Sequence, residues 1–271
     1  MKLKVLHIIK SLGRGGAEML LPETIKIHDP DKYEFHCIYF LPWKNQMVGI
    51  LESLGVIVTC LNARNNIELM LKAEKVIAYV NNQNIGLIHC HLPWAGFLGR
   101  YVHFRLKCSV LYTEHNKQER YHFITSWLNK RTFNYQTRAI AVSQDVSSSI
   151  YQNIKPKIPI ETIKNGVNTE YFKKDENQRV FMRQKYNIPE HGILVGTVAV
   201  FRFQKRLKEW LHVISQARLT SNQIYGVIVG AGPLYDEVRQ ERDNLGLEDC
   251  VLMPGLQTNM VDWYYNMDIF M

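Results

Sequence analysis

The chain has 271 residues, of which 46% are hydrophobic and 21% are charged, and its formal net charge is +8. These proportions are ordinary for a globular protein and exclude global disorder. No apolar run approaches the ~18 residues that a membrane-spanning helix needs. The whole charge excess lies within residues 1–170, which indicates either an anionic partner for this part of the chain or charge that serves solubility alone.

The N-terminal segment is the first expected strand. Met1–Lys10 is basic and apolar like the start of a secretory signal, but it continues into a glycine-rich turn at Gly13–Gly16 and not into a cleavage site. We therefore interpret it as a strand of a cytoplasmic protein. The five cysteines include no CxxC pair, so we expect buried free thiols and neither a zinc site nor a disulfide framework.

Short apolar strands alternate with helices through the first 170 residues. The expected strands are Lys4–Ile9, Glu34–Phe40, Val56–Leu61, Leu87–His91, Ser109–Thr113, Arg138–Val142 and Ile160–Ile163. The expected helices are Glu18–Ile27, Ile67–Val80, Ala95–Phe104, Glu119–Phe133 and Gln144–Gln152. This alternation predicts parallel β-α-β units, and the continuous Val/Ile/Leu runs predict a sheet that is buried on both faces.

The alternation restarts after a turn signal at Ile163–Asn168, so we place a domain boundary near residue 170, between domains 1–170 and 171–271. The next expected strands are Leu194–Val200, Gly226–Val229 and Cys250–Met253. The expected helices are Gln178–Tyr186, Leu207–Ala217, Pro233–Asn244 and Met260–Asn266. A fourth strand begins at Ile269 and the chain stops at Met271. Because so few strands leave an open sheet edge, we expect a C-terminally shortened form of a longer protein.

Two glycine-rich turns follow expected strands, at Gly13–Glu18 and Gly230–Leu234. Such turns let backbone N–H groups and a helix N-terminus approach a ligand, although a tight structural turn is an equal alternative for each. The dinucleotide fingerprint GxGxxG is broken in both, because Glu18 and Tyr235 stand where it needs glycine. Pro233 suits the first position of the helix that follows.

A basic cluster, Val200–Arg206, follows the strand that opens the second domain. Arginine offers a bidentate fork and lysine a point charge, so Arg202 and Lys205 suit a diphosphate. A solvated charge cluster is the alternative interpretation.

Histidines near strand ends are candidates for hydrogen bonding or proton transfer. His115 directly follows an expected strand and points toward the edge where α/β proteins bind ligands, although a lone histidine is more often structural. His89 and His91 share one strand face with Cys90 opposite. No acidic or thiolate partner is evident, so we expect no metal there.

Several of these segments together resemble a known family. They are Gly15–Glu18, the Thr-Glu-His-Asn segment around His115, Asn165–Val167, and the later segments FRFQKR, IVGAGPLYDEV and LGLEDCVLMPGL. From Leu3 to the end, the chain resembles glycosyltransferase family 4, or glycosyl transferases group 1. The resemblance implies a GT-B fold with two Rossmann-like, doubly wound parallel-sheet domains facing a cleft. The first would bind the acceptor and the second, incomplete here, the donor.

The resemblance also implies roles for individual residues. His115 matches the histidine near the reacting sugar, and Lys205 matches the lysine that contacts the donor diphosphate. Further matches are Gly15 and Gly16 at the first-domain loop, Gly230 and Gly232 in the donor loop, and Asn165 and Gly166 at the hinge. The family commonly has an arginine where Val200 stands, which leaves open whether Arg202 substitutes for it. The family's paired glutamates should lie beyond Met271.

The implied function is a retaining hexosyltransferase-type reaction in polysaccharide or glycan biosynthesis. It would move a sugar from a nucleotide-diphosphate sugar to a carbohydrate or lipid-linked acceptor, without a metal ion and without nucleic acid as a partner. An inactive binding remnant of such an enzyme is the alternative, and a Rossmann oxidoreductase is a weaker one because both glycine loops break its fingerprint. The sequence names neither the base, the sugar, the acceptor nor the linkage.

The expected helix Glu119–Phe133 carries an aromatic stripe with basic flanks. Phe123 and Trp127 recur at helical spacing, and Lys130 and Arg131 follow them. Such a helix can lie in the interface of an anionic membrane, here at its inner face. The alternative is that the stripe packs into the core of the first domain.

Overall fold

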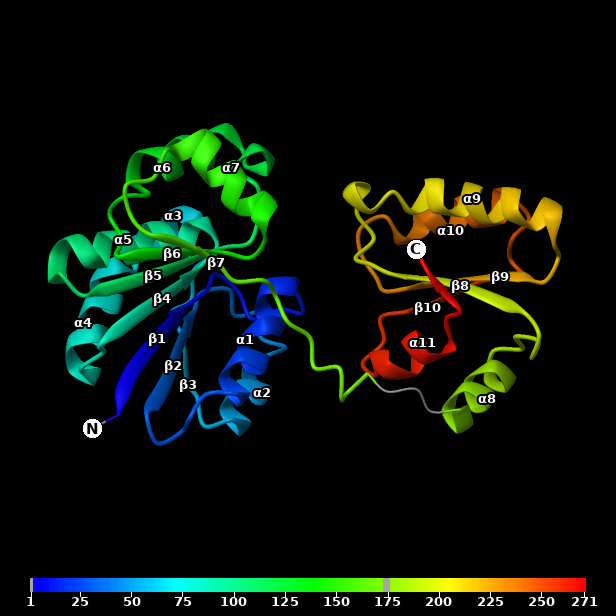
Figure 1. The fold of residues 1–271 in the computed structure, drawn as a ribbon, viewed down its shortest axis with the longest axis horizontal. Coiled ribbons are helices and arrows are strands. Elements are labelled where there is room, and N and C mark those ends of the chain that lie inside the picture. Colours follow the sequence, from blue (N-terminus) through cyan, green and yellow to red (C-terminus); the bar gives the residue numbers. More distant parts are fainter. Residues whose placement is uncertain (1, 173–175) are drawn as a thin grey trace. The chain divides into compact units, whose positions relative to one another are not determined.

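The chain folds into two α/β units, and the computed structural model divides them between Gly166 and Val167. The structure describes residues 2–172 and 176–271. Each unit is built on a sheet of parallel strands with helices on its faces (Figure 1). The parallel sheets that the sequence alternation predicts are therefore confirmed.

The first unit contains a seven-stranded sheet in the order β3-β2-β1-β4-β5-β6-β7. The strands are β1 (Leu3–Ile8), β2 (Tyr33–Tyr39), β3 (Ile57–Cys60), β4 (Leu87–His91), β5 (Ser109–Glu114), β6 (Arg138–Ala141) and β7 (Ile160–Thr162). The helices are α1 (Gly16–Lys26), α2 (Val48–Ser53), α3 (Asn66–Leu71), α4 (Ala73–Gln83), α5 (Pro93–Leu106), η1 (Gln118–Arg120), α6 (Phe123–Thr132) and α7 (Gln144–Ile154).

The helices of the first unit differ from the expected ones at three places. Helix α2 is absent from the sequence prediction. The helix expected over Ile67–Val80 is two helices, because the chain leaves the helical conformation at Lys72, which caps α3 and precedes α4. Helix α6 begins at Phe123 and not at Glu119, because His122 has an extended backbone.

The central strands of this sheet are buried on both faces, as predicted. On β2, Ile38 packs into the core formed with α3, α4, α5 and α7, whereas Cys37 and Tyr39 pack into the core formed with α1 and α2. This alternation is the ordinary two-residue period of a strand. All five cysteines are free, and burial raises the pKa of the Cys37 thiol to about 12.

The aromatic stripe of α6 does not pack into a core. Phe123 is 73% exposed and Trp127 is 57% exposed, whereas Phe133, just after the helix, is buried. The alternative that this stripe belongs to the core is therefore wrong. Within the residues that the structure describes, no helix combines the length and the apolar character needed to cross a membrane.

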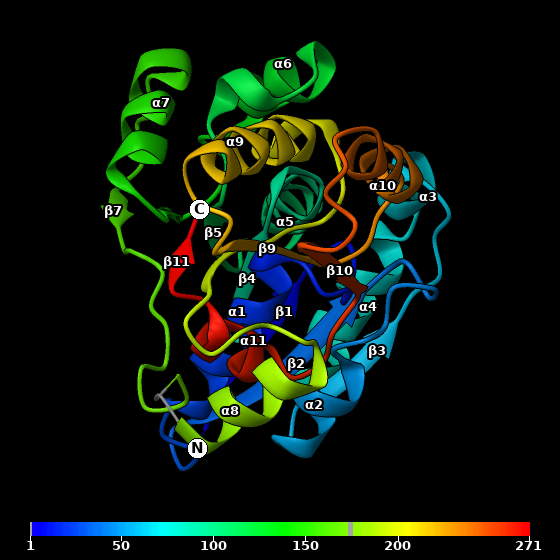
Figure 2. The ribbon, with the colours of Figure 1, turned by 90° about the vertical axis from the view of Figure 1, so that its right-hand side faces the viewer.

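The second unit contains a four-stranded sheet in the order β10-β9-β8-β11. The strands are β8 (Ile193–Val198), β9 (Ile224–Val229), β10 (Val251–Gly255) and β11 (Ile269–Phe270), and the helices are α8 (Glu176–Lys185), η2 (Phe203–Lys205), α9 (Leu207–Thr220), α10 (Tyr235–Asn244) and α11 (Met260–Asn266). Helices α9 and α10 cover one face, and α8 and α11 the other (Figure 2). Pro233 is not the first helical residue, since Leu234 caps α10.

Candidate functional site

The predicted residues of the first unit lie beyond the carboxyl ends of β1 and β5. Strand β1 lies between β2 and β4, so the order of the sheet reverses beside it. In open parallel sheets, ligands bind beyond the carboxyl ends of the strands at such a switch point. The loop after β1 leads to Gly15 and Gly16, and His115 directly follows β5. The topology thus brings these three residues to one edge of the sheet.

Gly15 caps helix α1, and Gly16 is the first residue of this helix. A Cβ atom on Gly15 would lie 2.3 Å from Oε2 of Glu18, whereas one on Gly16 would have nothing within 4 Å. Glu18 also accepts a hydrogen bond from the Ser11 hydroxyl at 2.8 Å. The first turn of α1 is therefore closely packed on one side and open at Gly16, where a helix N-terminus can accept an anionic group.

His115 carries a neutral imidazole at neutral pH. Burial lowers its pKa to about 4. Among the described residues, its Nε2 atom is buried and has no hydrogen-bond partner. A neutral imidazole donates from one nitrogen and accepts at the other, so Nε2 is an unsatisfied donor or acceptor, depending on the tautomer.

The preceding residue, Glu114, holds the His115 segment in place. Its side chain is fully buried. The carboxylate accepts hydrogen bonds from the backbone N–H groups of His115 (3.0 Å) and Asn116 (3.2 Å) and from the side chains of Tyr112 (2.8 Å), Gln118 (2.8 Å) and Tyr121. Burial raises the pKa of Glu114, and the hydrogen bonds oppose that shift. The backbone that carries His115 is thus fixed by a saturated buried acceptor.

The network around Glu114 extends to a buried arginine. Asn129 of α6 donates to Gln118 Oε1 at 2.8 Å and accepts from Arg100 Nη1 at 2.8 Å. Arg100, on α5, is 2% exposed. Its guanidinium lies 4.8 Å from the ring centre of Tyr112 and 5.2 Å from that of Phe133. Cation–π contacts and hydrogen bonds to neutral amides therefore stabilise the buried guanidinium of Arg100. The same contacts join β5, α5 and α6.

Three histidines cluster on the face of the sheet beside this edge. His7 Nδ1 and His91 Nε2 share a hydrogen bond of 3.1 Å, and His89 Nε2 bonds the Thr113 hydroxyl at 2.7 Å. The three imidazoles offer nitrogens within 4.8 Å of one another. Imidazole is a ligand that transition metals prefer. The prediction that His89 and His91 share one face of the strand, with Cys90 on the opposite face, is confirmed. Cys90 packs into the core formed with α3, α4, α5 and α7.

The predicted cations of the second unit lie at its own switch point. Strand β8 lies between β9 and β11, and the segment after it contains Arg202 and Lys205, both exposed. Among the residues described, neither makes an ion pair. Arg206, the next cation, pairs with Glu209 at 3.0 Å. Arg202 and Lys205 are therefore the cations of this loop that are free to contact an anionic ligand.

Gly230 and Gly232 allow the loop after β9 to lie directly on the loop after β8. Gly230 has a φ of +140°, and a Cβ atom there would lie 2.0 Å from the carbonyl oxygen of Ala199. A Cβ atom on Gly232 would lie 2.7 Å from the backbone nitrogen of Phe201. Both glycines are thus required by close backbone approach, and they support the segment that presents Arg202.

Asn165 and Gly166 lie at the end of the first unit, and both are exposed. A Cβ atom on Gly166 would meet nothing within 4 Å. Their role as a hinge stays a prediction.

Comparison with known sequences decides the family. The sequence model of Glycosyltransferase Family 4 matches residues 36–171, half of the chain. The chain belongs to glycosyltransferase family 4. This membership argues against the oxidoreductase alternative.

This family 4 chain is also similar to curated proteins. It is 24% identical over 213 residues to the capsular polysaccharide biosynthesis glycosyltransferase CapH of Staphylococcus aureus. The matched segment covers 74% of this chain and 58% of CapH. It is 20% identical over 198 residues to the alpha-monoglucosyldiacylglycerol synthase of Streptococcus pneumoniae, covering 68% of this chain and 45% of that protein. The chain thus spans about half the length of these relatives.

Solved structures share the fold of this family 4 chain. Anabaena HepE in complex with UDP and glucose superposes with a TM-score of 0.83 at 19% identity, covering 99% of this chain and 73% of HepE. The sucrose-phosphate synthase of Thermosynechococcus elongatus gives a TM-score of 0.80 at 15% identity, with coverages of 99% and 75%. The two doubly wound parallel units are therefore of the GT-B type, as the sequence resemblance implies.

The predicted site residues are divided between the two units of this family 4 protein. Sequence reasoning missed Glu114 and His7. Glu114 is a polar residue that ends an apolar strand, and His7 is one that interrupts an apolar strand. This break in the apolar run is the signal that could have found them. A cavity of about 300 Å³ follows β2 and β3 at the same edge of the first unit. It is lined by Pro42, Trp43, Asn62, Ala63, Arg64 and Glu68.

Proposed function

We propose that this family 4 protein transfers a sugar from a nucleotide-diphosphate sugar to an acceptor hydroxyl, with retention of the anomeric configuration. The observation that carries the proposal is the pair of exposed cations Arg202 and Lys205, which have no ion-pair partner among the described residues. They lie on a loop that Gly230 and Gly232 hold at the ligand edge of the second unit. The HepE structure contains UDP and glucose, which supports a nucleotide sugar as the donor.

In this reaction the bond between the anomeric carbon and the diphosphate oxygen breaks. The acceptor oxygen bonds to the same face of that carbon, and the proton of the acceptor hydroxyl passes to the departing diphosphate. Negative charge grows on the departing diphosphate. Preorganised cations stabilise such charge more in the transition state than in the ground state. Arg202 and Lys205 supply the positive charge here, so the proposed transfer requires no metal ion.

His115 acts as a hydrogen-bond partner of the reacting sugar in this proposal. Its lowered pKa keeps the imidazole neutral at neutral pH, and its Nε2 atom, which has no partner in the described part of the chain, would make the bond. Gly15 and Gly16 would form the adjoining loop that faces donor phosphate and acceptor. Because Glu114 fixes the backbone beside His115, no part of the binding energy need be spent on ordering this segment.

The acceptor we propose is a carbohydrate or a lipid-linked carbohydrate of glycan biosynthesis at the inner face of the membrane. CapH is named for capsular polysaccharide, and the streptococcal relative is named for a glucosylated diacylglycerol. The exposed aromatic and basic residues of α6 support a peripheral contact with an anionic membrane. Because these relatives carry enzyme names, an inactive binding remnant is not favoured.

Thermal unfolding with a panel of nucleotides tests the proposal. A ligand that binds only the native state, at 100 times its Kd, stabilises that state by about 2.7 kcal/mol. We expect one or more nucleoside diphosphates to raise the melting temperature and the corresponding monophosphate to raise it less. A shift with NAD but with none of UDP, GDP, ADP and TDP would reject the proposal.

A further inference from the structure

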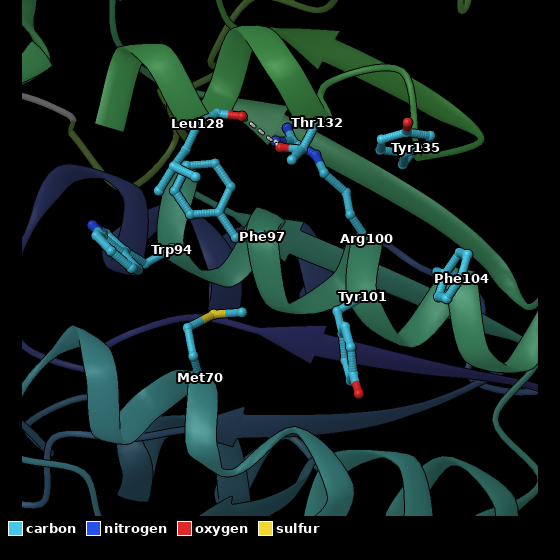
Figure 3. Close-up of a pocket in the computed structure, with 9 residues that line it drawn as sticks. All are labelled: Met70, Trp94, Phe97, Arg100, Tyr101, Phe104, Leu128, Thr132 and Tyr135. Atoms are coloured by element: carbon cyan, nitrogen blue, oxygen red, sulfur yellow. Dashed lines mark hydrogen bonds between the residues drawn. The ribbon is translucent and has the colours of Figure 1, made fainter. Parts of the chain in front are cut away.

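An apolar groove lies on the first unit, between α3, α5 and α6. Its volume is about 580 Å³, within the ~300–1,000 Å³ typical of small-molecule sites. Helix α5 contributes Trp94, Phe97, Tyr101 and Phe104, and helix α6 contributes Leu128 and Thr132 (Figure 3). None of these six residues belongs to the donor or acceptor residues assigned above.

The groove runs along α5. Its aromatic α5 residues are spaced by three, four and three positions, which places them in one row on the helix. The row extends from Trp94 to Phe104, about 15 Å along the axis, with Met70 of α3 on one side and Leu128 on the other (Figure 3). A trough of this length with a flexible thioether in its wall suits an extended hydrocarbon chain better than a rigid planar ring.

The groove is preformed. Arg100 of α5 also lines it, and its guanidinium donates to Thr132 Oγ1 at 2.9 Å and to Gln136 Oε1 at 2.8 Å. These bonds tie α5, the helix that forms one wall, to α6 and the segment after it. A site whose walls are already ordered costs a ligand little entropy to occupy.

One end of the groove is apolar and cationic. Phe104 is 64% exposed, and the Nζ atom of Lys107 lies 5.3 Å from its ring centre. Arg105 lies over Tyr101 and pairs with Glu74 at 2.8 Å. In the described part of the chain Lys107 has no ion-pair partner. An apolar trough with a free cation at its mouth is complementary to a chain that carries an anionic head.

We propose that this groove binds one acyl chain of an anionic membrane phospholipid, with the chain lying along α5 toward Trp94 and the phosphate at Lys107. The lipid would hold the first unit at a membrane surface through a specific site, in addition to any contact that the exposed face of α6 makes. The proposal does not depend on the sugar-transfer chemistry, because it concerns other residues.

Direct binding of oleoyl-lysophosphatidylglycerol, kept below its micelle concentration, tests the proposal by calorimetry on the whole chain. We expect saturable binding at one site. Leu128→Arg places a charged chain in the α6 wall and should weaken binding at least tenfold. Lys107→Gln should remove the preference over oleoyl-lysophosphatidylcholine. The matched control is Leu219→Arg, at an exposed leucine of α9, which should bind like the wild type.

A fluorescence measurement keeps the test independent of whether Leu128→Arg folds. In a Trp127→Phe background, lysophosphatidylglycerol with a brominated chain should quench tryptophan emission, and Trp94→Phe should remove that quenching. Quenching that survives Trp94→Phe overturns the proposal, as does unchanged affinity in a folded Leu128→Arg variant. Equal affinity for glycerophosphoglycerol, which has the head but no chain, would leave only an anion site and would also overturn it.

Discussion

The carboxylate of Glu114 accepts the backbone N–H of its neighbour His115 at 3.0 Å. This bond lies where β5 ends, so the same residue that closes the strand fixes the direction in which the next side chain leaves it. Glu114 therefore acts as a positioning residue for His115, while Nε2 of the imidazole has no partner among the residues that the structure describes.

We expect Glu114→Gln to destabilise the first unit and to lower turnover. The amide NH₂ would face groups that already donate, including Tyr112 and Gln118, and would leave buried donors unpaired at a cost of about 1–3 kcal/mol. Urea unfolding measures the change in stability. Glu52→Gln, at an exposed glutamate of α2, is the matched control and should change stability little. Equal stability of the two variants would show that the Glu114 network does not hold this segment.

His115→Ala should lower turnover on the order of a hundredfold and leave the affinity for the nucleotide diphosphate nearly unchanged. The reason is that the cations proposed to bind the diphosphate, Arg202 and Lys205, lie in the other unit. Steady-state kinetics give kcat, and calorimetry gives the Kd of the diphosphate. The result that contradicts the assignment is a loss of diphosphate affinity with unaltered kcat.

Lys205→Ala should weaken binding of the nucleotide diphosphate, because it removes a charge-assisted contact of roughly 1.5–3 kcal/mol. At 1.4 kcal/mol per tenfold, the Kd should rise about tenfold or more. The matched control is Lys208→Ala, at another lysine that follows β8 but pairs with Glu237 at 3.1 Å. Arg202→Ala should behave like Lys205→Ala if Arg202 replaces the arginine missing at Val200. Unchanged Kd in Lys205→Ala would discard the site.

Acid should destabilise the first unit through its buried histidines. The pKa of His115 is lowered by burial to about 4 from 6.5, and the pKa values of His7, His89 and His91 are also lowered, chiefly by burial. Between the two pKa values of His115, the unfolded chain binds a proton that the folded chain does not. The contribution of the neutral His115 to the free energy of unfolding is therefore fully present above pH ~6.5. It falls as the pH drops toward 4, by on the order of 3 kcal/mol for His115 alone.

Chemical denaturation at several pH values between 7.5 and 4.5 measures this dependence. His115→Gln should flatten the slope, whereas His122→Gln, at an exposed histidine of the same unit, should leave it as in the wild type. A free energy of unfolding that rises on acidification would contradict the argument.

Much of the fold was predictable because buried parallel strands are continuous apolar runs. The expected strand Leu87–His91 coincides with β4, and the expected helix Met260–Asn266 coincides with α11. The break at Lys72 was not predictable, since the apolar spacing continues through it and only tertiary packing decides where one helix ends.

The positions of the candidate site residues were predictable where topology alone determines them. His115 and Gly16 both follow strands, and in a parallel sheet the carboxyl ends of strands meet at one edge. Arg100 and Glu114 were not predictable, because charged residues are rarely buried, and the partners that make burial tolerable are distant in sequence. Asn129, for example, is 29 residues from Arg100.

Helix α6 should bind anionic membranes through its exposed face. Phe123 and Trp127 are exposed, and the guanidinium of Arg131 lies 5.7 Å from the ring centre of Trp127. Aromatic rings at headgroup depth and cations on anionic lipids favour attachment by about 1 kcal/mol per basic residue near the surface. In flotation with vesicles containing phosphatidylglycerol, we expect K130Q/R131Q to float less than the wild type, and wild-type binding to weaken with salt. K155Q/K157Q, at exposed lysines elsewhere on the unit, is the matched control. Equal flotation of the two double variants, or none of the wild type at low salt, would exclude this face.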